Sequence, residues 1–377
     1  MRRTAIVGLG ITGFSCVRYL HGRERLVVLD TRPAPPLHAE LSRDFPDVEV
    51  RLMATDFDPQ GFDRAIISPG VSLDSCLLAR AKGRIAFDSD IDLFCDAASA
   101  PIIAITGTNG KSTVTDLTGH LLNSCGRNVP VGGNLGAAAL DLLDDSADAY
   151  VLELSSFQLE RLRRHHFAAA GLLNLSEDHL DRHGDMATYL ASKQSIYRDC
   201  ALAVANRLDS RTLPEYPVER QITFGDNPAP SQADWGIIER DGRRLLAQGD
   251  RVLCAANELA IAGRHNELNA LAACALAMSQ GLDFESLAAP LRAYPGLPHR
   301  AQRVCIAERV EYINDSKATN VGATLAALSG FGDPARRRLI LIAGGDGKAA
   351  DFSALRDSVA AFVRTLILLG KDAPALE

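Results

Sequence analysis

The sequence predicts an α/β protein with parallel sheets and two or three domains. Its 377 residues exceed what one ordinary hydrophobic core accommodates. Short apolar segments such as PIIAITG and AYVLELS alternate with helical segments rich in alanine and leucine. These apolar segments end in Gly, Ser, Asp or Asn turns, which is typical of parallel sheets that bind ligands at the carboxyl ends of their strands.

The composition excludes several classes of partner. The formal net charge is −7, and no basic tail or stripe is present. We therefore expect no nucleic acid partner and no attraction to an anionic membrane surface. No apolar run reaches the roughly 18 residues that span a membrane, so membrane insertion is not expected. Eight scattered cysteines without a C-x-x-C pair argue against a disulfide framework, and we predict a cytoplasmic protein.

The first element is a strand that enters a glycine-rich turn, Gly8-x-Gly10-x-x-Gly13, before a helix. Asp30 closes the next strand, where an acid often binds a ribose. Backbone N–H groups in such a turn favour any diphosphate. The pattern alone leaves an NAD-dependent oxidoreductase open as an alternative.

A helix and linker over residues 88–100 precede a second glycine-rich loop, TGTNGKST. It follows an apolar strand and opens a helix, so its N–H groups can surround phosphate oxygens, with a lysine for charge and a hydroxyl for Mg²⁺. Only two residues separate its glycines, fewer than in common P-loops. The residues expected to hold a nucleotide are Gly107, Thr108, Asn109, Gly110, Lys111, Ser112 and Thr113.

Acidic and histidine side chains follow the next two strands. Glu153 ends an apolar strand, where a buried carboxylate indicates a positively charged partner such as Mg²⁺. The segment NLSEDHLDRHG then places His179 and His183 four residues apart. Zinc is one interpretation, but no third ligand has metal-like spacing, and a charged surface loop is the simpler one.

The remaining segments supply hairpins and polar clusters. Residues 214–260 indicate a strand-rich insertion with hairpins in WGIIERDGRRLLAQGD. His265, Asn266 and Asn269 begin a helix, where they can cap it. After a second boundary at 294–300, the segment INDSKATN gathers polar residues behind a strand, and LIAGGDGKAADF forms a third glycine turn.

Together these segments resemble the Mur ligases, the ATP-dependent amide ligases of peptidoglycan precursor synthesis. The match is closest to the members that add D-glutamate. The segments that carry the resemblance are GLGITGFSC, LDTR, SPG, GGNLG, the GTNGKST loop, ELSSFQL, LSEDHLDRHG and NDSKATNVGAT.

The resemblance implies three domains and one reaction. A Rossmann-like domain (1–93) would bind the UDP precursor, a P-loop domain (94–298) would bind ATP, and a second Rossmann-like domain (299–377) would bind the amino acid. The implied reaction adds D-glutamate to UDP-N-acetylmuramoyl-L-alanine through an acyl phosphate, using ATP and two Mg²⁺ ions. A monomer is expected.

The resemblance also implies the site residues. Lys111, Glu153, His179 and Lys193 would be catalytic, and Ser112, Glu153, His179 and carbamylated Lys193 would hold the metals. ATP would further contact Asn269, Arg300 and Asp315, and D-glutamate would contact Lys317, Thr319 and Lys348. The UDP substrate would contact Thr12, Asp30, Thr31, Arg32, Ser68, Pro69, Gly70, Asn134, Gln158 and His179.

The sequence departs from the family at its carboxyl end, VRTLILLGKDAPALE. The family's third domain continues for several more strand–helix units, so this domain is expected to be incomplete, with an exposed TLILL strand and slow or absent ligation. A non-catalytic nucleotide-binding relative is therefore an alternative. Folylpolyglutamate synthase shares a similar loop, but the N-terminal GLGITG, DTR and SPG series argues against it.

Overall fold

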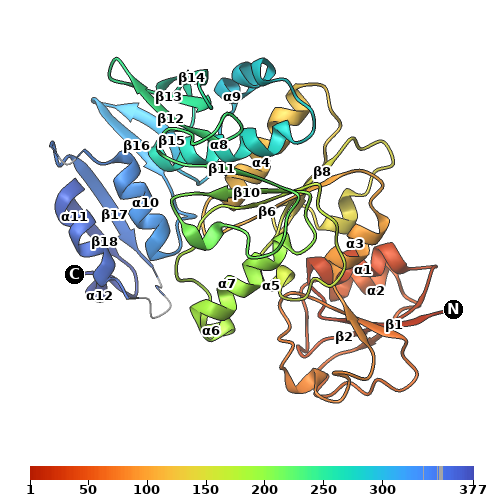
Figure 1. The fold of residues 1–377 in the computed structure, drawn as a ribbon. Coiled ribbons are helices and arrows are strands. Elements are labelled where there is room, and N and C mark those ends of the chain that lie inside the picture. The colour runs from red at the N-terminus through yellow and green to blue at the C-terminus, as the bar shows by residue number, and fades with distance from the viewer. Residues whose placement is uncertain (334, 346, 348–350) are drawn as a thin grey trace.

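A computed structural model describes residues 1–333, 335–345, 347 and 351–377. The chain forms three α/β domains in order along the sequence (Figure 1). The first domain lies at the lower right of Figure 1, the middle domain occupies the centre, and the third domain lies at the left. In the described part of the chain, no helix is both long and apolar enough to cross a membrane.

The first domain is built on a parallel sheet of five strands in the order β3-β2-β1-β4-β5. Its central strands are buried on both faces, which explains their continuous apolar sequences. The strands are β1 Arg3–Val7, β2 Arg25–Leu29, β3 Glu49–Arg51, β4 Arg64–Ile67 and β5 Ala86–Asp88, and the helices are α1 Ile11–Leu20, α2 His38–Asp44 and α3 Asp90–Ala97. The helix expected within 88–100 is thus α3, which begins with a Ser89–Asp92 capping box.

The middle domain contains a sheet of nine strands in the order β14-β13-β12-β11-β10-β9-β6-β8-β7. Strands β6 to β12 pair in parallel, and β12, β13 and β14 form the expected antiparallel hairpins. The strands are β6 Ile102–Thr106, β7 Val131–Gly133, β8 Tyr150–Glu153, β9 Ala169–Leu172, β10 Leu202–Asn206, β11 Arg220–Phe224, β12 Trp235–Arg240, β13 Arg243–Gln248 and β14 Arg251–Ala255.

Two long helices, α4 (Lys111–Ser124) and α8 (Arg264–Met278), pack together beside this sheet. The face of α8 that lies in the core carries alanine and leucine, which allow close approach to the strands. The shorter helices of this domain are α5 Ser156–Leu159, α6 Leu180–His183, α7 Met186–Gln194 and α9 Ala288–Ala293.

The third domain contains two small sheets. Strands β15 (Gln302–Ala307) and β16 (Val310–Asn314) are antiparallel, whereas β17 (Leu339–Gly344) and β18 (Val363–Leu369) are parallel. Its helices are α10 Val321–Phe331, α11 Arg356–Phe362 and α12 Ala373–Leu376. Ile367 and Leu369 of the TLILL strand are exposed, as the sequence predicted.

Candidate functional site

A cavity of about 510 Å³ lies at the carboxyl ends of β1, β2 and β4. We call it the Gly8 cavity. It is lined by nine of the ten residues predicted to contact the UDP substrate, and only His179 is absent. The nine are Thr12, Asp30, Thr31, Arg32, Ser68, Pro69, Gly70, Asn134 and Gln158. Asn134 and Gln158 come from the middle domain, so the cavity spans two domains.

The glycine turn at the base of this cavity is tightly packed. A Cβ at Gly13 would lie 1.9 Å from the Gly8 carbonyl oxygen, so only glycine allows α1 to approach the turn. Both Asp30 oxygens are bonded, one to the Leu9 N–H at 2.7 Å and the other to Arg32. Burial alone would raise the pKa of Asp30, but these hydrogen bonds from Arg32 and Leu9 together lower it to about 2. Asp30 therefore fixes the shape of the turn as an anion.

The second glycine-rich loop, residues 106–113, connects β6 to α4; we call it the phosphate loop. Gly110 has φ +81° and directly precedes the helix, and a Cβ there would lie 2.5 Å from Asn269 Oδ1. Because α4 begins at Lys111, the N–H groups of its first turn face out of the helix end. This arrangement suits an anion such as a phosphate.

Two lysine side chains, one from the loop itself and one from α7, bond to the backbone of the phosphate loop. Lys111 Nζ donates to the carbonyls of Gly107 (2.9 Å) and Thr108 (2.8 Å). Lys193, on α7, is 1% exposed and donates to the same Gly107 carbonyl at 2.8 Å. Burial lowers the pKa of both ammonium groups, and Lys111 lowers that of Lys193 further. Two basic groups thus lie together where phosphates would bind.

Glu153 connects the phosphate loop to the Gly8 cavity. Its side chain is buried at the end of β8, as the sequence predicted, and its charge acts on both Lys111 and Lys193. Oε1 accepts a hydrogen bond of 2.6 Å from Asn134, which lines the Gly8 cavity. Oε2 is buried and has no hydrogen-bond partner among the residues that the structure describes. An unpaired buried carboxylate oxygen is costly, so this oxygen has the chemistry of a cation ligand.

The two histidines of residues 174–184 differ in their surroundings. His179 has the left-handed φ of +55°, is partly exposed and lies beside Phe157. His183 is buried against the same ring and hydrogen bonds to Ser156 at 2.9 Å. Within the described ranges, no three His, Cys, Asp or Glu side chains form a metal-binding group.

Of the residues predicted in the third domain, Arg300 contacts the phosphate loop. Arg300 donates to Ser112 Oγ at 2.8 Å, and Asp315 accepts from the Ala301 N–H at 2.9 Å. Lys317 and Thr319 are exposed in the segment that follows Asp315. Lys348, the remaining residue predicted to contact D-glutamate, lies outside the described residues.

Three site residues were not predicted from the sequence. Asn174 accepts from the Asn109 N–H (2.8 Å) and donates to its carbonyl (3.0 Å). Tyr189 bonds to Thr108 Oγ1 at 3.1 Å, and its ring lies under Lys193 Nζ. Arg161 donates to carbonyls of the first domain. Asn174 follows β9 at the carboxyl edge, a position that could have identified it; the other two have no such signal.

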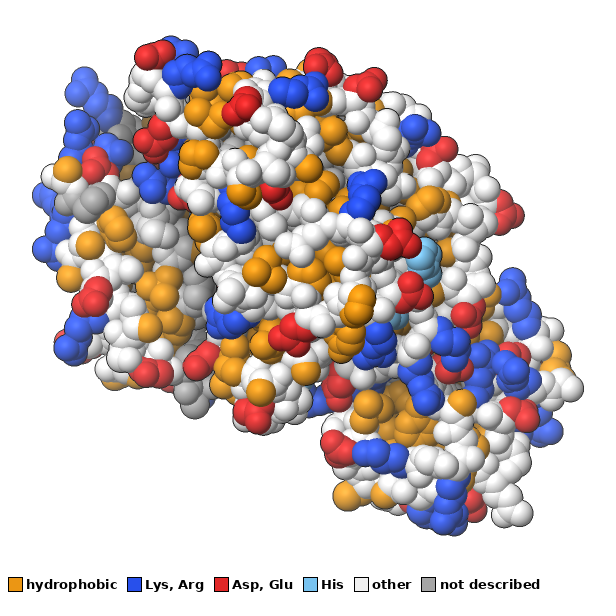
Figure 2. All heavy atoms as spheres, viewed as in Figure 1, with side chains coloured by type: hydrophobic (Ala, Val, Ile, Leu, Met, Phe, Trp, Pro, Cys, Tyr) orange, Lys and Arg blue, Asp and Glu red, His pale blue; other side chains and the backbone are white. Residues whose placement is uncertain are grey.

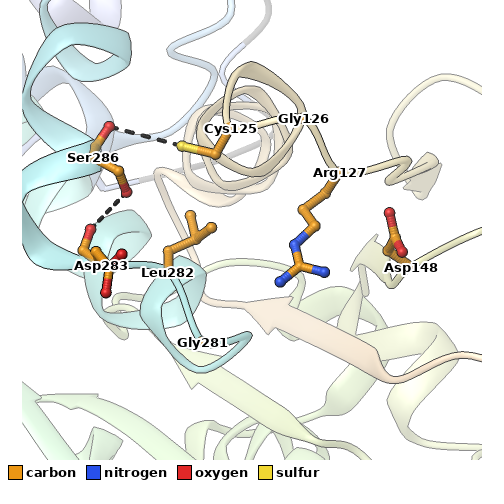
Figure 3. A pocket seen from close by; sticks show the side chains of 8 residues that line it. All are labelled: Cys125, Gly126, Arg127, Asp148, Gly281, Leu282, Asp283 and Ser286. Atoms are coloured by element: carbon orange, nitrogen blue, oxygen red, sulfur yellow. Dashed lines mark hydrogen bonds between the residues drawn. The ribbon is translucent and has the colours of Figure 1, made fainter.

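A second cavity, of about 480 Å³, lies at the opposite end of α4 (Figure 3). Cys125 and Ser286 are joined there by a hydrogen bond, with Arg127 and Asp148 on the other side. A helix of 14 residues is about 20 Å long, so this cavity is separate from the phosphate loop.

Comparison with known protein families gives three matches in chain order. Residues 2–86 match the Mur ligase MurD-like N-terminal domain, residues 105–277 match the Mur ligase middle domain, and residues 299–377 match the Mur ligase glutamate ligase domain. These matches follow the three domains of the structure.

Curated relatives are similar over nearly the whole chain, and those cited here carry the name UDP-N-acetylmuramoylalanine–D-glutamate ligase. The protein of Marinobacter nauticus is 48% identical, over 99% of this chain and 84% of the relative. That of Pseudomonas putida is 46% identical, over 98% and 83%. That of Legionella pneumophila is 44% identical, over 99% and 85%.

Solved structures share the fold at lower identity. MurF of Acinetobacter baumannii superimposes with a TM-score of 0.63 at 18% identity, over 99% of this chain and 82% of that one. UDP-N-acetylmuramate–alanine ligase of Thermotoga maritima gives 0.59 at 19% identity, over 98% and 91%. At these identities the likeness concerns the three-domain fold alone.

Proposed function

The chain belongs to the Mur ligase family, and from this premise we propose that it joins D-glutamate to UDP-N-acetylmuramoyl-L-alanine with conversion of ATP to ADP and phosphate. The observation that carries the proposal is the Asn134–Glu153 hydrogen bond. It joins the Gly8 cavity to the carboxylate that faces Lys111, so a precursor in the cavity can present its alanyl end to a nucleotide on the phosphate loop.

The Gly8 cavity is the proposed UDP-precursor site. The turn before α1 offers backbone N–H groups to a diphosphate, and Arg32 lies at the same rim. Since Asp30 already bonds to Leu9 and Arg32, its role is to hold this turn. The cavity extends to Asn134 and Gln158, which support a muramoyl-alanyl end at the middle domain.

The phosphate loop is the proposed ATP site. In the first step the alanyl carboxylate attacks the γ-phosphorus and ADP leaves; in the second the D-glutamate amine attacks the acyl carbon and phosphate leaves. Both reactants of the first step are anions, so a concentration of positive charge lowers their repulsion. Lys111 supplies that charge, and the α4 N-terminus and the Arg300 contact with Ser112 support the nucleotide.

Mg²⁺ fits this site at Glu153, whose buried Oε2 has no hydrogen-bond partner. We propose that Glu153, Ser112 and His179 hold up to two Mg²⁺ ions together with phosphate oxygens. Bound Mg²⁺ would neutralise charge on the transferring phosphoryl group. Phosphate oxygens would complete a coordination shell that the protein leaves open.

Lys193 is the proposed site of carbamylation. Its ammonium is buried beside that of Lys111, which favours the neutral amine. The amine nitrogen attacks the carbon of CO₂, an N–C bond forms, and one proton is released to give an anionic carbamate. That anion would relieve the repulsion by Lys111 and face the metal site. A carbamate signal in ¹³C NMR with labelled bicarbonate, absent in Lys193→Ala, tests this assignment.

The third domain is the proposed D-glutamate domain, with Lys317 and Thr319 beside the Asp315 segment. We further propose a monomeric, cytoplasmic enzyme. Each of the eight cysteines is a free thiol, which suits a reducing compartment. Acidic and basic side chains are interspersed on the face shown in Figure 2, which supports small-molecule substrates over nucleic acid.

The proposal is tested by incubating the purified chain with UDP-N-acetylmuramoyl-L-alanine, ATP and D-glutamate. We expect ADP release that requires all three compounds, together with a product whose mass has increased by one glutamyl residue. L-Glutamate in place of D-glutamate is the control. Nucleotide binding without any product would refute ligase activity and favour a non-catalytic nucleotide-binding protein.

A further inference from the structure

The amino end of α10, in the third domain, contacts the phosphate loop of the middle domain. The contact is an exchange of side-chain amides between Asn109 and Asn320. Asn320 Nδ2 donates to Asn109 Oδ1 at 3.2 Å, and Asn109 Nδ2 donates to Asn320 Oδ1 at 3.4 Å. These residues are 211 positions apart in the sequence, so the pair connects two domains.

Asn320 serves two purposes at once. Its Oδ1 accepts the Ala323 N–H at 2.8 Å, which caps α10. Its Nδ2 is left to bond outside the helix, to Asn109 and to Asp178 Oδ2 at 3.2 Å. Serine, threonine or aspartate would also cap the helix, but none of them carries an amide NH₂ that can donate to two acceptors at once. The choice of asparagine is explained by the contact with the middle domain.

Both partners of Asn320 belong to the nucleotide site. The backbone of Asn109 is held on both sides by Asn174, so its side chain has a fixed direction. The charge of Asp178 acts on both Lys111 and Lys193. A displacement of α10 would therefore alter the loop that faces the phosphates and the carboxylate that faces the two lysines.

Close packing holds the same contact. A Cβ at Gly322, in the first turn of α10, would lie 2.6 Å from Ser176 Oγ and 3.3 Å from Asn109 Nδ2. The segment before Asn320 carries Lys317 and Thr319, proposed above for D-glutamate. Asn320 thus directly follows the segment proposed for the incoming amino acid and contacts the phosphate loop.

We propose that Asn320 is a positioning residue, which fixes the third domain on the phosphate loop through Asn109 and Asp178 and so aligns D-glutamate with the activated carboxylate. This inference rests on the proposed function for its substrate. It predicts that loss of the Nδ2 donor lowers kcat and raises KM for D-glutamate. Binding of the UDP precursor, in the distant Gly8 cavity, stays unchanged.

The test uses the full chain and five variants. Asn320→Ser keeps the helix cap and removes the Nδ2 donor. Asn320→Asp keeps the cap but opposes the Asp178 carboxylate, and Asp178→Asn in the same chain restores a donor and acceptor pair. Ser329→Ala is the control, because Ser329 is exposed on α10 and, within the described part of the chain, its hydroxyl donates to carbonyls of that helix. Asp178→Asn alone completes a double-mutant cycle.

We expect Asn320→Ser and Asn320→Asp to lower kcat/KM for D-glutamate about ten-fold or more, with thermal unfolding close to that of Ser329→Ala. The Asn320→Asp/Asp178→Asn chain is expected to recover activity beyond the sum of its single changes. Additive effects in the cycle, or an equal loss in Ser329→Ala, would overturn the inference.

Amide hydrogen exchange tests the inference independently of the ligation reaction. In the presence of a non-hydrolysable ATP analogue, amides of residues 107–113 are expected to exchange faster in Asn320→Ser than in wild type. If the wild-type chain does not ligate D-glutamate, the proposed function fails while this exchange still decides the inference. Equal exchange in both chains would then refute it.

Discussion

Substitution of Arg161 by methionine is expected to weaken binding of the UDP precursor without changing ATP binding. Arg161 is 5% exposed in the middle domain, and its guanidinium donates across the domain boundary to the carbonyls of Ser68 (2.9 Å) and Val71. Ser68 Oγ in turn donates to the Gly8 carbonyl at 2.9 Å. Arg161 therefore holds the Ser68–Val71 segment of the Gly8 cavity against the middle domain, together with Arg182, which also donates to the Val71 carbonyl at 3.2 Å.

The size of the effect follows from these two contacts. A hydrogen bond that involves a charged group contributes about 1.5–3 kcal/mol, so two contribute at most about 6 kcal/mol. Burial of the guanidinium, which lowers the pKa of Arg161 to about 10, offsets part of this gain. We expect a net loss of about 2–3 kcal/mol. Because the precursor would contact both domains, the loss appears in its affinity, as about a 30- to 150-fold higher Kd.

Isothermal titration calorimetry with UDP-N-acetylmuramoyl-L-alanine and, separately, with a non-hydrolysable ATP analogue measures this effect. Arg163→Met is the matched control, since Arg163 is exposed and, within the described residues, its side chain makes one hydrogen bond to the first domain, of 3.2 Å to the Phe87 carbonyl. Arg161→Lys, which keeps the charge but fewer donors, is expected to fall between wild type and Arg161→Met. An unchanged precursor Kd, or an equal loss of affinity for both ligands, would refute the reasoning.

Three further substitutions address the two loops. Gly110→Ala places a Cβ against Asn269 and in a left-handed backbone conformation that costs about 1–2 kcal/mol, so ATP affinity is expected to fall at least ten-fold. Gly126→Ala is the control for the backbone strain alone, because Gly126 has a similar φ and open space around it. Equal ATP affinity in wild type and Gly110→Ala would contradict the prediction. Asp30→Asn is expected to be less stable than wild type at pH 7. Because the folded pKa of Asp30, about 2, lies below the ordinary 3.8, denaturant titrations should show this difference in stability shrinking as the pH falls from about 4 towards 2. A difference that is constant with pH would contradict the prediction. Lys193→Met is expected to be more stable than wild type in CO₂-free buffer at pH 7. The pKa of Lys193 is depressed in the folded state, so the free energy of unfolding of the wild type increases as the pH rises towards 10.5. A difference in stability between the two chains that widens with pH would show that Lys193 is not held neutral.

The sequence predicted the elements that have a local signature. Glycines at strand ends, a lysine followed by two hydroxyl residues, and Glu153 at the end of an apolar strand are visible without any knowledge of tertiary contacts. Their side chains meet because the carboxyl ends of parallel strands share one edge of a sheet. The same rule explains why residues as distant as Thr12 and Gly70 line one cavity.

The contacts between domains could not be predicted in this way. Arg161 bonds to carbonyls, which every residue carries, so nothing in the sequence of Ser68 or Val71 identifies them as its partners. In the sequence, Asn320 looks like an ordinary helix N-cap. Its contact with Asn109 depends on how the third domain is oriented on the middle domain. Helix capping and domain docking use the same residue type, and only the structure separates them.

The two glycine-rich loops of this chain differ in how their charges are satisfied. In the first, Asp30 is neutralised by Arg32 and by a backbone N–H, so the turn is complete without a ligand. In the second, Lys111 and Lys193 share the Gly107 carbonyl as an acceptor, and one Glu153 oxygen has no hydrogen-bond partner among the described residues. A buried polar atom without a partner costs about 1–3 kcal/mol, and a bound cation would remove that cost. The first loop is therefore organised to recognise a ligand by shape. The second is held in an unfavourable electrostatic state that a metal–nucleotide complex would relieve, which explains why the reaction is expected at the phosphate loop.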